Sequence, residues 1–265
     1  MSLLGNIGVT SMNRCALLVM CGIIILAGCT TSTEPDYVER PATEIYNTAL
    51  EALQAGDYET AATEFTEVER QHPYSVWARR AILLSAYAYY VDEEYDQSIL
   101  AAQRYIMLYP GGERAPYAYY LVAICFYEQI TDVTRDQRRT EEALAALEEI
   151  VRRFPDTEYA RDASFKIDLA RDHLAGKEME VGRYYLNQEA YSAAIGRFLE
   201  VLARYQTTTH APEALHRLTE AYLALGLHEQ AQASAAILGY NYPASKWYEY
   251  SYALVGDPSY QPLER

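Results

Sequence analysis

Basic residues and cysteines are scarce in this sequence. Against 37 Asp and Glu there are only 22 Lys and Arg, so the formal net charge is −15. Because phosphate backbones are bound by clusters of basic side chains, this charge balance argues against nucleic acid as a partner. Of the four cysteines, only Cys125 lies beyond residue 29, and no disulfide is therefore expected in the folded part of the chain.

Sequence signatures of catalysis and of metal binding are also missing. The five histidines form no His-Glu-x-x-His or Cys/His ligand pattern, and there is no glycine-rich phosphate loop or Gly-x-Ser-x-Gly turn. Cys125 lies in an apolar segment, where a thiol behaves as an inert core group. The sequence predicts a protein that is not an enzyme and that needs no metal or cofactor. The competing enzyme hypothesis, a lipid-anchored hydrolase, would require a nucleophile and a base in one cleft.

The apolar run near the N-terminus is too short to span a membrane. It extends over 13 residues, from Cys15 to Ala27, whereas a membrane-spanning helix needs about 20. The run follows Met12-Asn13-Arg14 and ends in Leu26-Ala27-Gly28-Cys29, which is typical of a signal peptide over residues 1–28 with Met12 as the candidate true start. The ending resembles the lipobox of bacterial lipoproteins, in which the cysteine sulfur carries a diacylglycerol. The alternative is ordinary cleavage that leaves Cys29 unmodified.

Lipidation of Cys29, with a diacylglycerol and an N-acyl chain, would anchor the protein durably, because two membrane signals suffice where one acyl chain is marginal. Residues 29–40 are polar and contain Pro35, as expected of a short tether. Thr30, rather than Asp, follows the cysteine. In enterobacterial lipoproteins, which the lipobox resembles, this implies sorting to the outer membrane. We therefore expect a protein that is lipid-anchored on the periplasmic face of the outer membrane.

The rest of the chain contains a recurring pair of amphipathic helices. In the first copy, Gly56-Asp57 separates two helical patterns, and Pro73 ends the second. The pattern resembles the tetratricopeptide repeat, a helix-turn-helix unit of 34 residues. It predicts an all-α fold, a right-handed superhelix of about five irregular tetratricopeptide repeats with one extra helix near residues 159–174. The equivalent small residues are spaced 37 to 51 residues apart: Ala61, Ser98, Ala143, Ala194 and Ala231.

These repeats predict the organisation of the mature chain. Repeats 1 and 2 occupy residues 41–110. Repeat 3, with an inserted polar loop at 131–140 and the extra helix, occupies residues 111–174. Repeats 4 and 5 and a C-terminal tail occupy residues 175–265.

Tyrosine is abundant, with 26 residues against only 5 phenylalanines. In tetratricopeptide repeats, the first helix of each pair lines the concave side. This geometry predicts an aromatic trough with one cation, which would bind an extended peptide through aromatic side chains and a terminal carboxylate. The alternative is that the tyrosines only pack helix on helix. Counted from Ala42, Arg79 and Pro116 as first helical positions, the residues that line the trough are Tyr46, Arg80, Tyr87, Tyr90, Tyr117, Tyr120 and Tyr127.

Several segments taken together resemble the BamD family, the tetratricopeptide lipoproteins of the outer-membrane β-barrel assembly machinery. They are the lipobox, the irregular repeats, residues 155–163 and 171–185, and the ending Tyr242–Tyr248; the resemblance spans about residues 29–248. It implies a non-catalytic scaffold that docks on the periplasmic domain of BamA, contacts other Bam lipoproteins, and binds C-terminal signals of unfolded outer-membrane β-barrel proteins through its first repeats. Arg197 matches an arginine that contacts BamA in the family.

The chain departs from some members of this family in two places. The insertion at 131–140 is shorter, and Gln206 stands where a helix-ending proline is usual. Contacts to other lipoproteins through that loop are therefore left open. The alternative reading is a pilotin-like tetratricopeptide lipoprotein for secretin assembly, which would show more regular repeats and no extra helix.

Overall fold

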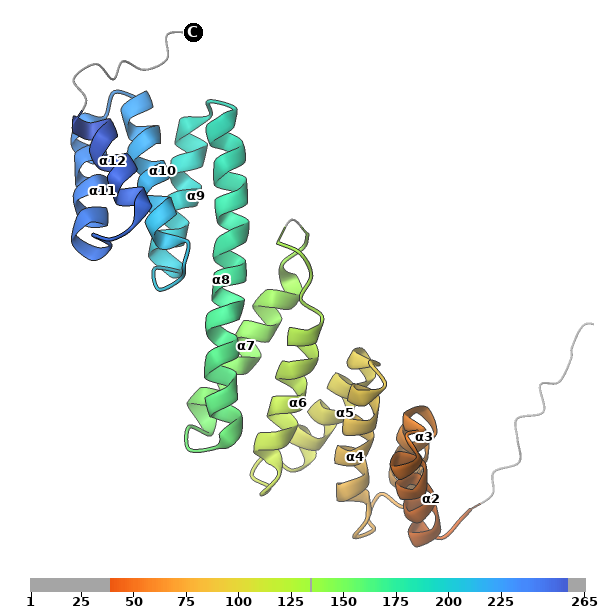
Figure 1. Ribbon diagram of the computed structural model, residues 1–265. Helices are drawn as coiled ribbons and strands as arrows, with labels where there is room; N and C mark the ends of the chain where they lie inside the picture. Colours follow the sequence, from red (N-terminus) through yellow and green to blue (C-terminus); the bar gives the residue numbers. More distant parts are fainter. Residues whose placement is uncertain (1–38, 134, 257–265) are drawn as a thin grey trace, which may run out of the picture. The chain divides into compact units, whose positions relative to one another are not determined.

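The computed structural model describes residues 39–133 and 135–256 (Figure 1). The chain divides into two units, Met1–Arg40 and Pro41–Arg265. The predicted signal peptide, Cys29 and all but the last two residues of the predicted tether lie outside the described residues. Every helix named below belongs to the second unit.

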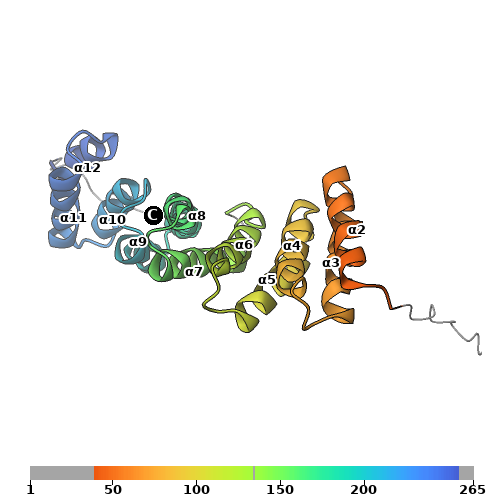
Figure 2. The same cartoon turned by 90° about the horizontal axis from the view of Figure 1, so that it is seen from below.

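The second unit is entirely helical over the described residues, and each helix packs against the one before it and the one after it (Figures 1 and 2). No helix in residues 39–133 or 135–256 combines the length and the apolar character needed to cross a membrane. The helices are α2 (Ala42–Ala55), α3 (Tyr58–Gln71), α4 (Ala78–Val91), α5 (Tyr95–Leu108), α6 (Ala115–Glu128), α7 (Arg138–Arg153), α8 (Glu158–Asn187), α9 (Tyr191–Arg204), α10 (Ala211–Ala224), α11 (His228–Asn241) and α12 (Lys246–Gly256).

The turns inside the repeats share one backbone feature. Gly56, which ends α2, adopts φ 80°, a left-handed conformation that glycine reaches without strain. The side chain of Asp57 then caps α3 by accepting a hydrogen bond of 3.1 Å from the backbone N–H of Thr60. The turns that end α4, α8 and α10 also contain one residue with positive φ, namely Glu93, Glu189 and Gly226. One local conformation therefore closes four of the helix pairs.

The small residues that set the repeat phase lie where paired helices approach closely. Ala61, Ala143, Ala194, Ala231 and the polar Ser98 all have no exposed surface. The Ser98 hydroxyl donates a hydrogen bond of 2.7 Å to the carbonyl oxygen of Ala86 in α4, so its polarity is satisfied inside the pair. The all-α prediction, a stack of tetratricopeptide helix pairs, is confirmed.

Helix α8 differs in its length from what the repeat pattern indicated. The extra helix expected near residues 159–174 does not end there: it continues into the first helix of repeat 4 and forms one helix of 30 residues. Thr157 caps its start, and no proline interrupts it before Asn187. The expected boundary between residues 174 and 175 therefore lies inside a continuous helix.

The C-terminal region also contains an additional helix. Residues 246–256, expected to belong to the last repeat or its tail, form α12, which packs on α10 and α11. The ring of Trp247 lies 5.2 Å from that of His216, between ring centroids. His216 Nδ1 and Ser251 Oγ, both buried, form a hydrogen bond of 2.9 Å. This helix covers apolar surface of α10 that the repeat pair would otherwise leave open.

Candidate functional site

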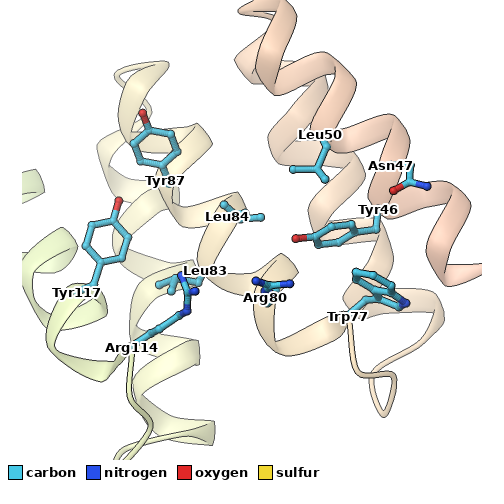
Figure 3. Close-up of a pocket in the computed structure, with 10 residues that line it drawn as sticks. All are labelled: Tyr46, Asn47, Leu50, Trp77, Arg80, Leu83, Leu84, Tyr87, Arg114 and Tyr117. Atoms are coloured by element: carbon cyan, nitrogen blue, oxygen red, sulfur yellow. The ribbon is translucent and has the colours of Figure 1, made fainter.

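A groove of about 630 Å³ lies along the first helices of the first three repeats (Figure 3). α2, α4 and α6 supply its walls, together with the residues that directly precede α4 and α6. Its lining is mainly apolar and aromatic, with arginines on the side nearest the starts of α4 and α6. The lining residues are Tyr46, Asn47, Leu50, Trp77, Arg80, Leu83, Leu84, Tyr87, Arg114 and Tyr117.

Four of the seven predicted trough residues line this groove: Tyr46, Arg80, Tyr87 and Tyr117. They are not equally available to a ligand. Tyr46 is only 5% exposed, because its ring packs 4.7 Å from that of Trp77 and 5.5 Å from that of Phe65. Tyr87 is 36% exposed. Tyr46 therefore forms part of the groove floor, whereas Tyr87 presents its ring to a ligand (Figure 3).

The other three predicted residues lie outside the groove. Tyr90 packs against Tyr95, with ring centroids 6.2 Å apart. The Tyr120 hydroxyl donates a hydrogen bond of 2.7 Å to Asp162 Oδ2 in α8, and the ring of Tyr127 lies 5.5 Å from Lys166 Nζ of the same helix.

The expected extension of the trough to Tyr90, Tyr120 and Tyr127 is therefore corrected. The first half of α8, which the repeat pattern does not require, contacts α6 and engages Tyr120 and Tyr127. Tyr90 lies in α4 and packs instead against Tyr95 of α5. The side chains of Tyr90, Tyr120 and Tyr127 therefore contact neighbouring helices, as the alternative of helix-on-helix packing predicts.

Several groove residues could not be found by counting from the first helical position. Trp77 and Arg114 are the cap residues just before α4 and α6, so a count that begins inside the helix passes over them. The sequence indicated them only through the type of side chain: an aromatic residue, Trp77, and a cation, Arg114, each stand next to the start of a helix. With Arg114, the groove has two arginines rather than the one expected.

Charge and protonation in the groove favour a ligand that is apolar with a negative group. Neither Arg80 nor Arg114 makes an ion pair within residues 39–133 and 135–256, and in Figure 3 both lie at the same side of the groove. The Tyr117 phenol is protonated at neutral pH and can donate a hydrogen bond, and burial raises its pKa further. Such a surface fits a peptide segment with apolar side chains and a carboxylate.

The predicted partner-binding residue Arg197 lies in a different, polar hollow of about 560 Å³ in repeat 4. Its guanidinium forms an ion pair with Glu178 of α8, with Nη1 and Oε2 3.1 Å apart, and its side chain is 46% exposed. The Arg197 side chain therefore lies at the surface. The ion pair holds it against α8 in the free protein.

Neither a cluster of metal ligands nor an accessible thiol is present among the described residues. Within residues 39–133 and 135–256, no group of three or more His, Cys, Asp or Glu side chains could hold a metal ion. Cys125 is fully buried, and burial raises the pKa of its thiol to about 11. A thiol in that environment stays protonated and is a poor nucleophile.

Comparisons with known proteins agree with this architecture. The model of the YfiO family, described as outer membrane lipoprotein, matches residues 38–237. A Caulobacter vibrioides protein named outer membrane protein assembly factor BamD is 50% identical over 94% of this chain and 83% of its own length. Proteins of the same name from Rickettsia prowazekii and Neisseria meningitidis serogroup A are 43% and 33% identical, covering 88% and 76% of this chain and 92% and 79% of their own lengths.

Among solved structures, the TPR domain of P58(IPK) resembles the chain with a TM-score of 0.43 and 14% identity, over 80% of this chain and 55% of that one. The family match and the curated relatives show that the chain belongs to the YfiO family of outer membrane lipoproteins, as its resemblance to BamD proteins predicted.

Proposed function

We propose that this chain is a non-catalytic scaffold for outer-membrane β-barrel protein assembly, and that the groove at Tyr87 binds C-terminal segments of unfolded barrel proteins. The observation that carries the proposal is the aromatic groove with its two arginines, in a chain whose relatives are named outer membrane protein assembly factors. An extended chain end could place alternate side chains on the rings and Leu83, and its carboxylate beside Arg80 and Arg114.

Peptide titration tests this function. A labelled peptide that ends in an aromatic residue is titrated with the wild type, Tyr87→Ala and Arg80→Gln, and binding is followed by fluorescence anisotropy. We expect each variant to weaken binding by roughly tenfold, about 1.4 kcal/mol, because aromatic and arginine anchors dominate such surfaces. Tyr240→Ala is the matched control, because Tyr240 is 89% exposed and lies in α11, outside the groove. Equal affinity of all four proteins would contradict the proposal.

A second part of the proposal concerns docking. The hollow around Arg197 is proposed to bind the periplasmic domain of BamA, as the family resemblance implies. Truncating one member of a charge pair at an interface costs about 2 kcal/mol or more, whereas an exposed ion pair adds at most about 1 kcal/mol to folding stability. Arg197→Leu should therefore reduce co-purification with BamA and change the melting temperature little. Arg171→Leu is the control, since Arg171 also forms an exposed interhelical ion pair, with Glu148 at 2.7 Å. Equal co-purification of both variants would remove Arg197 from the interface.

The third part concerns attachment to the membrane. Cys29 is proposed to carry the diacylglycerol and N-acyl lipid that hold the protein on the periplasmic face of the outer membrane. Cys29→Ala, in protein whose signal peptide has been removed, should leave the helices folded, measured by circular dichroism, and release the protein from the membrane fraction. If that variant still sediments with membranes stripped of Bam partners, another anchor must exist.

Contacts with other Bam lipoproteins stay predictions. The pilotin alternative gains no support from irregular repeat spacing and a helix as long as α8.

A further inference from the structure

The first two repeats have two chemically different ends. Each repeat is a pair of helices joined by a short turn, so one end holds the turns within the repeats, at residues 56–57 and 92–94. The other holds the loops that lead to the next repeat, at residues 72–77 and 109–114. We call these the turn end and the loop end.

Large apolar side chains are exposed at the loop end. Tyr74 is 100% exposed and Val76 is 84% exposed, and both lie in the loop between α3 and α4. Met107 and Leu108, at the end of α5, are 74% and 49% exposed. The exposed charged residues of the turn end are instead acidic: Asp57, Glu59, Glu93, Glu94 and Asp96.

Charge follows the same division. Arg79, Arg80 and Arg114 lie at the loop end, and none of them forms an ion pair with a described residue; Arg79 stacks over the ring of Tyr109 at 5.4 Å. The acids at this end are Glu113, Glu44 in the first turn of α2, Glu39 just before it, and Glu67 and Glu69 near the end of α3. Glu67 is paired with Arg70 and Glu69 with Arg104. The chain has a net charge of −15, yet this surface combines exposed apolar groups with three arginines that form no ion pair with a described residue. This combination is complementary to a partner surface that has both apolar groups and anionic phosphates.

The first helix of the repeats also begins at this end. α2 begins after Pro41, and because α2 and α3 form an antiparallel pair, its start lies beside the end of α3. The ring contact of Tyr46, in the first turns of α2, with Trp77, at the end of the α3–α4 loop, confirms that the two regions are adjacent. In Figure 1 the start of α2 and this loop lie at the same, lower end.

We propose that the loop end of repeats 1 and 2 rests on the phospholipid surface, with Tyr74 and Val76 in the headgroup region. This inference rests on the proposed lipid anchor at Cys29. At a membrane surface, the amphipathic ring of a tyrosine lies at the level of the headgroups, and arginines attract lipid phosphates. The acids of the turn end then face away from the bilayer. The lipid anchor holds the protein near the membrane, and this second contact fixes which way the first repeats face.

The test uses full-length lipidated protein in vesicles of phosphatidylethanolamine and phosphatidylglycerol. A thiol-reactive, polarity-sensitive fluorophore is placed on Tyr74→Cys. The matched control is Glu59→Cys, an exposed position at the turn end of the same repeat. Cys125 is buried and Cys29 would carry lipid, so neither competes for the label. A second control, Tyr240→Cys, matches the exposure of Tyr74 in repeat 5.

We expect the label at position 74, but not at 59 or 240, to show blue-shifted emission and protection from iodide quenching when vesicles are present. Val76→Asp should reduce that shift. The same emission at all three positions, in protein that sediments with the vesicles, overturns the orientation and leaves the anchor standing. Failure of the lipidated protein to sediment with vesicles overturns the anchor and this inference together, whereas the peptide-binding proposal is measured independently.

Discussion

The hydroxyl of Tyr120 in α6 donates a hydrogen bond of 2.7 Å to Asp162 Oδ2 in α8, across 42 positions of sequence. Asp162 Oδ2 also forms an ion pair with Lys166, with Nζ and Oδ2 2.8 Å apart. This contact fixes the first half of α8 against α6 and takes Tyr120 out of the predicted trough. The groove is consequently confined to the α2, α4 and α6 surface near Tyr87.

Tyr120→Phe should lower the free energy of unfolding by about 1 kcal/mol, because it removes a hydrogen bond to a charged acceptor and leaves the ring in place. Peptide affinity of the groove should not change. The control is Tyr119→Phe, since the structure gives the neighbouring Tyr119 a ring contact with Phe154 and no hydroxyl hydrogen bond within the described residues. Urea unfolding of both variants measures the difference, and equal midpoints would mean that the Tyr120 hydroxyl contributes nothing.

The same contact predicts a pH dependence. Partial burial alone would raise the pKa of Asp162, but hydrogen bonds from Lys166 and Tyr120 outweigh it and hold the pKa below its usual value. A carboxyl with a depressed folded pKa contributes stability above its unfolded value of about 3.9 and loses that contribution as the pH falls through the folded pKa. Asp162→Asn should therefore be less stable than wild type at neutral pH, with the difference shrinking below about pH 4. Unfolding curves from pH 7 to pH 3 check this, and a constant difference would contradict it.

Gly182 permits the close approach of α8 and α9. A Cβ at this position would overlap the ring of Phe198, which is fully buried. Gly182→Ala should therefore destabilise the protein by about 1 to 3 kcal/mol through overpacking. Gly196→Ala is the matched control, because nothing lies within 4 Å of a Cβ there. In that helix interior, alanine should stabilise by up to about 1 kcal/mol. Thermal melts with opposite shifts are expected, and a shared direction would contradict the packing argument.

Tyr90 and Tyr87 lie on one helix, three residues apart, yet the structure gives them different surroundings. Tyr90 is partly buried and packs against the core cluster of α4, α5 and α6, whereas Tyr87 borders the groove. Tyr90→Ala should therefore lower the free energy of unfolding by about 3 kcal/mol, as truncation of a packed aromatic residue does. Tyr87→Ala should affect stability by less than half as much. Comparing their urea midpoints tests this assignment, and a larger loss for Tyr87→Ala would reverse it.

Much of the fold could be predicted because its determinants are local. The helix period, the glycine or acidic turn residues and the buried small residues at Ala61, Ser98 and Ala194 act over a few positions each. The same periodicity placed Tyr46, Arg80, Tyr87 and Tyr117 on the first helices, where the groove is found.

The remaining features depend on contacts between residues that are distant in sequence. The repeat pattern predicts a break between the extra helix and the first helix of repeat 4. No proline stands there, and the helix continues to Asn187. Only the packing of α8 on α6 decided that Tyr120 and Tyr127 contact Asp162 and Lys166 rather than a ligand.

The sequence by itself determined the helices, their pairing and the faces they present, because side-chain periodicity and turn residues act within one repeat. The tertiary structure decided which of those faces stay open. It placed the cap residues Trp77 and Arg114 in the groove, and it gathered Tyr74, Val76 and the arginines at one end of the first repeats. Whether a surface is covered or free depends on which helix packs over it, and the contacts that hold that helix in place come from residues that are distant in the sequence.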